Sequence, residues 1–124
     1  MTEDGSRYNF DGLVVFDLAN NHQGDIDHGC RIIRAMGEQA AKHGVKAAMK
    51  FQFRQLDTFI HKAHLDGSSN KHVSRFLSTR LDLDGVQKLF DEVKAAGLLS
   101  MCTPFDEESV DVIQDMGFDI LKIA

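Results

Sequence analysis

The sequence predicts an α/β fold built around a parallel sheet. Short apolar runs of strand type alternate with segments whose apolar residues recur every three or four positions, as on the buried face of a helix. A glycine marks the passage from a helix end to the next strand at Gly44, Gly97 and Gly117. This alternation gives the order βαβαβαβ with right-handed crossovers, which both a doubly wound sheet and a (β/α)8 barrel satisfy.

The first strand is predicted at residues 13–19 and the second at residues 47–53. The helix between them begins at a cap supplied by Asp25 or Asp27 and ends at Gly44. Because its apolar residues share one side, this helix should pack against the sheet.

The third strand is predicted at residues 98–103, after a helix that Asp82 or Asp84 caps. The segment before that helix, residues 54–80, has no clean period. We expect it to be an extended loop on the active face, with one short helix near residues 73–77.

The last unit begins where Pro104 ends the hydrogen bonding of the third strand. Asp106 is placed to cap a helix that Gly117 ends, and residues 119–124 form the fourth strand. The acidic residues that follow Asp106 are explained by the helix dipole rather than by a cation site.

Composition excludes several classes of function. The 124 residues are 43% hydrophobic and 27% charged, which is the balance of one folded domain. Lys and Arg number 14 against 19 Asp and Glu, so we expect no nucleic-acid partner. No apolar stretch approaches the roughly 20 residues that span a bilayer, and the first residues lack the apolar core of a signal peptide, so we expect a cytoplasmic protein without membrane contact. Cys30 and Cys102 form no C-x-x-C pair and should be reduced core residues.

Polar side chains lie near the carboxyl ends of the predicted strands, where α/β folds bind ligands: Asp17, Lys50, Thr103 and Lys122. A lysine is costly to bury without an anionic partner, yet two strands carry one and Asp17 is the single carboxylate available. This surplus of positive charge favours an anionic ligand, a phosphate or carboxylate, held by Lys50, Lys122 and the Thr103 hydroxyl. The alternative is that each lysine extends from its strand end to water.

Four short strings carry a resemblance to a known family. They are F-D-L-A-N-N-H-Q-G-D at residues 16–25, K-F-Q at residues 50–52, S-M-C-T-P-F-D at residues 100–106 and L-K-I-A at residues 121–124. In order and spacing they resemble the sialic acid synthase family (N-acetylneuraminate synthase, NeuB-like), which condenses phosphoenolpyruvate with N-acetylmannosamine or a related aldose. The likeness covers residues 12–124.

The resemblance implies a TIM-type (β/α)8 barrel, of which this chain carries about the first four strands. We expect residues 1–124 to be a fragment, the amino-terminal half of a synthase barrel with no second domain, because a complete barrel needs about 250 residues. A half-barrel exposes two unpaired sheet edges, so we expect a homo-oligomer, a dimer, and no synthase activity from these residues alone.

The resemblance also implies roles for the strand-end residues. Lys50, Thr103 and Lys122 would hold the phosphate and carboxylate of phosphoenolpyruvate, and Gln52 would contact the aldose. Asp17 would be catalytic: it stands where the family has a glutamate, and would assist proton transfer or orient water.

Further residues belong to the first loop and to a possible metal site. Asn21 and His22 would shape the first loop and contact substrate. A divalent metal, Mn or Mg, would polarise the sugar aldehyde, with ligands on later strands and none in this chain. His61, His64 and His72 lie close enough in sequence to suggest a metal site, but we expect solvated side chains there because the loop is polar.

Two other interpretations stay open. A different (β/α)8 enzyme acting on a phosphorylated sugar, an aldolase or isomerase, would use Lys50 or Lys122 as a Schiff-base amine. A non-catalytic half-barrel module would keep the anion-binding lysines without turnover.

Overall fold

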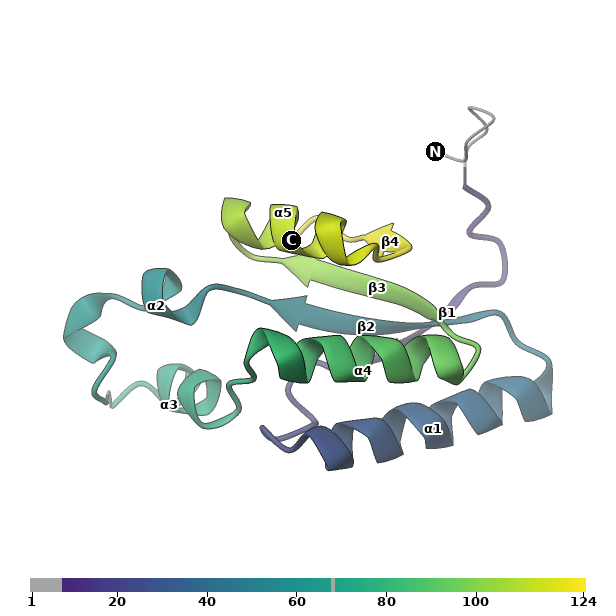
Figure 1. Cartoon of the computed structure of the whole chain (residues 1–124), viewed down its shortest axis with the longest axis horizontal. Coiled ribbons are helices and arrows are strands. Elements are labelled where there is room, and N and C mark those ends of the chain that lie inside the picture. Colours follow the sequence, from purple (N-terminus) through teal and green to yellow (C-terminus); the bar gives the residue numbers. More distant parts are fainter. Residues whose placement is uncertain (1–7, 68) are drawn as a thin grey trace.

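A parallel sheet of four strands lies at the centre of the molecule, in the order β1-β2-β3-β4 (Figure 1). The structure is a computed structural model that describes residues 8–67 and 69–124. Chain order and spatial order coincide, so each crossover leads to the neighbouring strand. The strands are β1 (Val14–Asp17), β2 (Ala47–Phe53), β3 (Leu99–Pro104) and β4 (Ile120–Leu121).

Three long helices form the crossovers: α1 (Ile26–His43), α4 (Leu83–Ala95) and α5 (Glu107–Met116). In Figure 1 they lie on the same side of the sheet. A doubly wound sheet carries helices on both faces, whereas the wall of a barrel carries them only outside. Within the described ranges, the helices follow the one-sided arrangement.

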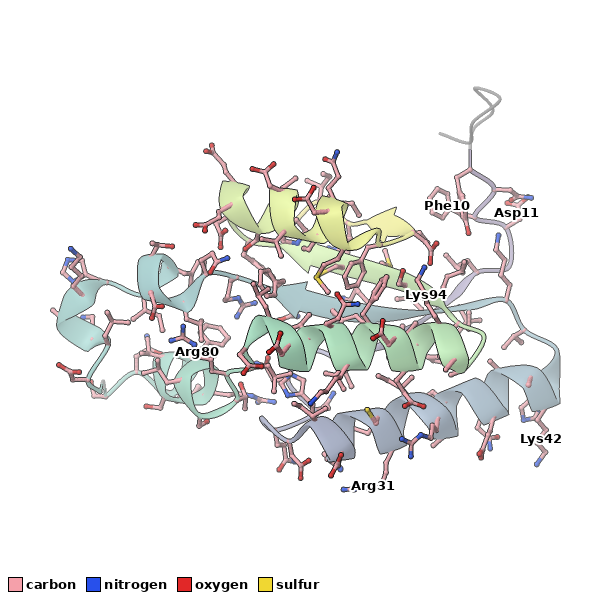
Figure 2. The ribbon with its side chains drawn as sticks, viewed as in Figure 1. Phe10, Asp11, Arg31, Lys42, Arg80 and Lys94 are labelled. Atoms are coloured by element: carbon pink, nitrogen blue, oxygen red, sulfur yellow. The ribbon has the colours of Figure 1, made fainter. Side chains whose placement is uncertain are left out.

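The hydrophobic core explains why the helices share this side. Alternate residues of β2, Ala47, Met49 and Phe51, are buried against apolar side chains of all three helices. Charged side chains on the outer side of α1, among them Arg31 and Lys42, point away from the sheet (Figure 2). The helix residues in this core include Cys30, Ile33, Ala40, Leu89, Val93 and Ile113.

Each long helix begins at an aspartate cap. The side chains of Asp25, Asp82 and Asp106 accept a hydrogen bond from the backbone N–H three residues further on, at 3.0, 2.7 and 2.8 Å. In the structure Asp25 rather than Asp27 caps α1, and Asp82 rather than Asp84 caps α4, a choice that the sequence spacing alone left open.

The predicted helix ends are confirmed at two of three glycines. Gly44 and Gly117 end α1 and α5 in the left-handed conformation, with φ of 61° and 79°. The C-cap of α4 is Ala96, and the left-handed residue is Gly97, which follows with φ of 72°.

The first and last strands are shorter than predicted. β1 ends at Asp17, although Leu18 N still donates to Lys50 O of β2 at 3.0 Å, and the chain then turns, with Asn21 N donating to Leu18 O at 2.9 Å. Leu18 is nevertheless 1% exposed, because its side chain still fills the core. β4 has two residues, although Lys122 N still donates to Cys102 O at 2.8 Å.

The segment at residues 54–80 is more ordered than predicted. It holds α2 (Leu56–Phe59), a 3-10 turn η1 (Lys62–His64) and α3 (Lys71–Ser78), where we expected a loop with one short helix. The short helix is confirmed, with wider bounds. The other two elements are four and three residues long, too short to show a helical period in the sequence.

The two cysteines are free thiols and both are buried, as the sequence predicted. Burial raises the pKa of the Cys102 thiol to about 12. Among the described residues, no helix is both long enough and apolar enough to cross a bilayer.

Gly37 offers a test of the packing between α1 and α4. A Cβ at this position would lie 2.9 Å from both the Cβ and the carbonyl oxygen of Ala96. We expect Gly37→Ala to lower the free energy of unfolding by about 1–3 kcal/mol through overpacking. This loss should appear although alanine favours a helix over glycine by about 1 kcal/mol.

Urea unfolding followed by circular dichroism measures the effect. Glu38→Ala, at the exposed neighbouring position of α1, is the control and should stay within about 0.5 kcal/mol of the wild type. A Gly37→Ala protein as stable as the wild type would contradict this close approach of the two helices.

Candidate functional site

An ion pair lies on the sheet face opposite the helix-packed core, near the carboxyl ends of β1 and β2. The strand register places Asp17 beside Lys50. Lys50 Nζ is 3.0 Å from Asp17 Oδ2, and the two side chains are 15% and 50% exposed. The single carboxylate available on these strands therefore neutralises the first of the two lysines, while remaining half open to solvent.

Gln52 and Thr103 lie beside one another further along the same face. Thr103 is 3% exposed, and its Oγ1 has no hydrogen-bond partner in the described part of the chain. A buried hydroxyl left without a partner costs about 1–3 kcal/mol. The Thr103 hydroxyl is thus a buried group whose hydrogen bond the described residues do not supply.

Lys122 follows β4 and does not take part in the ion pair between Asp17 and Lys50. Its Nζ donates to the carbonyl oxygen of Ile123 at 3.3 Å, in an exposed position. The three ion pairs formed among the described residues do not include it. The structure therefore joins Asp17 and Lys50, and leaves Lys122 with its charge unpaired.

The first loop is held by its own polar groups. His22 is 7% exposed, and its Nδ1 accepts a hydrogen bond from Gly24 N at 3.0 Å. Asn21 Nδ2 donates to the carbonyl oxygen of Asp17 at 3.4 Å. Ala19 has a φ of 42°, a region that few residues other than glycine adopt. Both predicted loop residues thus contribute to the turn that follows β1.

A cavity of about 440 Å³ opens beyond the ends of β1 and β2. Its walls come from the first loop, the end of β2, the residues after α3 and the beginning of α4. Two predicted site residues, His22 and Gln52, line this cavity. The other predicted residues are not in its walls: Asp17, Asn21, Lys50, Thr103 and Lys122.

Arg54 is the site residue that the sequence analysis missed. It follows β2 directly, lines the cavity, and donates from Nη2 to Gln52 Oε1 at 3.0 Å. Its guanidinium carbon lies 4.1, 4.2 and 5.4 Å from the ring centres of Phe105, Phe76 and Phe59. Such cation–π contacts are worth about 0.5–2 kcal/mol each. They tie the irregular segment after β2 to the end of β3.

A signal for Arg54 was present in the sequence. The residue continues the alternation of Lys50 and Gln52, so it belongs to the same face. The predicted strand ends one residue before Arg54, so its charge falls outside the strand pattern.

The charge of Arg54 has no carboxylate in direct contact. The ion pairs among the described residues join other groups. Burial lowers the pKa of the Arg54 guanidinium, and the charge of Asp106 opposes this shift. The oxygens of Asp106 already accept two backbone N–H groups at 2.8 Å each. Arg80, also in the cavity wall, forms two hydrogen bonds with Asp57 at 2.9 and 2.8 Å.

The histidines of the irregular segment do not form a metal site in the described structure. His61 and His64 have ring centres 6.1 Å apart. Across residues 8–67 and 69–124, no group of three or more His, Cys, Asp or Glu side chains is placed to hold a metal ion.

Comparisons with known proteins add an independent finding. The profile of the NeuB family matches residues 36–124. The chain is 30% identical over 123 residues to the uncharacterized protein MJ1065 of Methanocaldococcus jannaschii, covering 97% of this chain and 33% of the relative. It is 26% identical over 119 residues to N,N'-diacetyllegionaminic acid synthase of Legionella pneumophila, covering 90% of this chain and 32% of the relative.

A solved structure agrees with the fold. The crystal structure of a spore coat polysaccharide biosynthesis protein E from Chromobacterium violaceum superposes with a TM-score of 0.87 at 46% identity, over 91% of this chain and 34% of that one. The chain thus spans about a third of the length of the proteins it matches.

His22 makes the stability of the first loop depend on pH. Burial, and secondarily the charge of His28, lower its pKa. The unfolded chain takes up a proton near pH 6.5, where folded His22 does not, so this contribution to stability is complete above about pH 6.5 and is lost as the pH falls towards the lowered value. We expect His22→Asn, which keeps an acceptor for Gly24 N, to flatten the fall in the free energy of unfolding between about pH 7 and pH 5.

Urea unfolding at a series of pH values measures this slope. His72→Asn, at an exposed position in the first turn of α3, is the matched control and should leave the slope unchanged. An unaltered slope in the His22→Asn protein would refute the assignment.

Proposed function

Because this chain belongs to the NeuB family, we propose that it forms part of a phosphoenolpyruvate-dependent synthase. The reaction would join phosphoenolpyruvate to an N-acetylmannosamine-like aldose, forming a sialic-acid-type nonulosonic acid and releasing phosphate. The observation that carries the proposal is the placement of Asp17, Lys50 and Thr103 on one sheet face near the strand carboxyl ends. The synthase name of the Legionella relative supports it.

Phosphoenolpyruvate would bind through the two lysines and Thr103. Its phosphate and carboxylate carry negative charge, which Lys50 and Lys122 would neutralise. The partnerless hydroxyl of Thr103 would donate to one of the oxygens. Because Lys50 already has a carboxylate beside it and Lys122 has none, Lys122 would be the more available of the two to an incoming anion.

Asp17 would act on the proton of the attacking water. When C3 of phosphoenolpyruvate bonds to the aldehyde carbon of the aldose, the π electrons of the aldehyde move to its oxygen, which takes up a proton and becomes a hydroxyl, and positive charge develops at C2. Water then adds to C2, the C2–O bond to phosphate breaks, and the new hydroxyl at C2 loses its proton to leave a ketone and free phosphate. Asp17, which is half exposed and held by Lys50, would orient this water and accept its proton. Since aspartate is one methylene shorter than the family's glutamate, its reach depends on Lys50 holding it in place.

The aldose would lie near Gln52, with His22 and Asn21 shaping the first loop. Gln52 and His22 share the cavity wall, so a sugar there would meet polar groups from two strand ends. The proposal includes a whole (β/α)8 barrel, a homodimer and a cytoplasmic location. The one-sided packing of the described helices supports the barrel.

A divalent metal, when bound, would polarise the aldehyde of the aldose. The residues described do not fit this role, because they hold no group of three candidate ligands. No step above therefore runs through a metal.

The Schiff-base alternative makes a different chemical demand. It needs a neutral lysine amine, whereas Lys50 is held against a carboxylate at 3.0 Å. Borohydride treatment in the presence of a sugar phosphate would trap an imine as a stable adduct, visible by mass spectrometry. The synthase reaction forms no imine, so we expect no adduct.

Binding of phosphoenolpyruvate tests the assignment of Lys50. We expect Lys50→Met to weaken binding at least tenfold in a calorimetric titration, since a hydrogen bond to a charged group contributes about 1.5–3 kcal/mol. Lys46→Met is the matched control. It removes the same charge before β2, where Lys46 Nζ contacts Asn9 O at 2.6 Å, and should leave binding unchanged. An equal loss in both proteins would indicate an unspecific effect of net charge.

Turnover is a separate expectation. The 124-residue chain, mixed with phosphoenolpyruvate, N-acetylmannosamine and Mn²⁺, should release no phosphate above the rate in buffer, because it spans about a third of its relatives' length. A colorimetric phosphate assay measures this. Sustained release would contradict the expectation that further parts of a barrel are needed.

A further inference from the structure

The cavity next to Gln52 contains a positive charge that the proposed reaction leaves unused. Arg54 lines this cavity, is half-buried, and belongs to none of the ion pairs among the described residues. Its Nε is shielded from solvent and has no hydrogen-bond partner in the described structure. A partly buried cation with an unfilled donor is unfavourable unless a ligand or another anion completes it.

We propose that Arg54 forms an anion subsite that binds a carboxylate or phosphate group carried by the acceptor sugar. The inference rests on the proposed function for the position of the sugar. It adds that the acceptor is an acidic aldose rather than a neutral one.

The surroundings of Arg54 fit this role. The rings of Phe105, Phe76 and Phe59 lie within 4.1–5.4 Å of its guanidinium carbon, and they supply no hydrogen-bond acceptor. They hold the side chain in place, and within residues 8–67 and 69–124 its one side-chain hydrogen bond is the one that Nη2 donates to Gln52, while Nε has no partner. A planar guanidinium held in this way can give two parallel hydrogen bonds to a carboxylate or phosphate.

The contact with Gln52 connects the subsite to the acceptor. Gln52 Oε1 accepts from Arg54 Nη2 at 3.0 Å, so the amide nitrogen of Gln52 is the group that would donate to a ligand. A sugar whose hydroxyl oxygens accept from Gln52 would therefore place an acidic substituent within reach of Arg54.

The other charges in the cavity wall are already engaged or lie on another element. Arg80 is paired with Asp57 through two hydrogen bonds. Asp82 caps α4 by accepting from Gly85 N at 2.7 Å, and Asp84 lies in the first turn of that helix. Arg54 is thus the unpaired cation of this wall among the residues described.

The test compares sugars that differ only in an acidic group. N-acetylmannosamine, its 6-phosphate and N-acetylmannosaminuronic acid are titrated into the ¹⁵N-labelled chain, with inorganic phosphate as the simplest probe. The Nε–H signal of Arg54 is followed by NMR. We expect this signal to shift, and at least one acidic sugar to bind tenfold or more tightly than the neutral one. The sugar that does so identifies phosphate or carboxylate as the ligand group.

Variants then assign the preference to Arg54. Arg54→Met should abolish the preference for the acidic sugar, and Arg54→Lys should retain part of it. Arg80→Met, which removes the same charge from the same cavity wall, should leave it intact. The inference is overturned if no probe shifts the Arg54 signal, if neutral and acidic sugars bind equally, or if the preference persists in Arg54→Met.

The Arg54 subsite and the proposed synthase function can fail independently in these experiments. Phosphoenolpyruvate binding that depends on Lys50, without any preference for an acidic sugar, would overturn only the Arg54 subsite. An Arg54-dependent preference without phosphoenolpyruvate binding would uphold the subsite and overturn the synthase.

Discussion

Helix packing on one side of the sheet is the constraint on which the rest of the structure depends. Ala47, Met49 and Phe51 of β2 face the helices and form the core, so the intervening residues must face the other way. Lys50 and Gln52 are among these. A strand slipped by one residue would bury the lysine in the apolar core, at a cost that no nearby carboxylate could offset. The same register that forms the core therefore creates the polar face.

The positive charges of Lys50 and Arg54 are stabilised in two different ways. Lys50 lies against Asp17, so a cation and a carboxylate on neighbouring strands neutralise one another. Arg54 is instead enclosed by three phenylalanine rings from segments far apart in the sequence. The first arrangement leaves a half-exposed carboxylate next to the open face. The second leaves unfilled donors beside a cavity, and it also joins the segment after β2 to the end of β3.

Much of this organisation could be predicted because it rests on local rules. The aspartate caps, the glycine helix ends, the order of strands and the two buried cysteines follow from residues a few positions apart. The four motifs led to the NeuB family, and the family match confirms that resemblance. The roles of the substrate-binding and catalytic residues stay predictions, since their placement alone does not reveal what they bind.

The sequence by itself determined the parallel α/β fold, its family, and the set of polar residues near the strand carboxyl ends, because each depends on a periodicity or a short motif. Only the tertiary structure decided which residues meet. Leu18 follows β1 and is buried in the core, and Arg54 contacts the rings of Phe76 and Phe105, which lie far from it in the sequence. Local sequence patterns predict the helices and strands. Contacts between residues that are far apart in the sequence depend on how those elements pack in three dimensions.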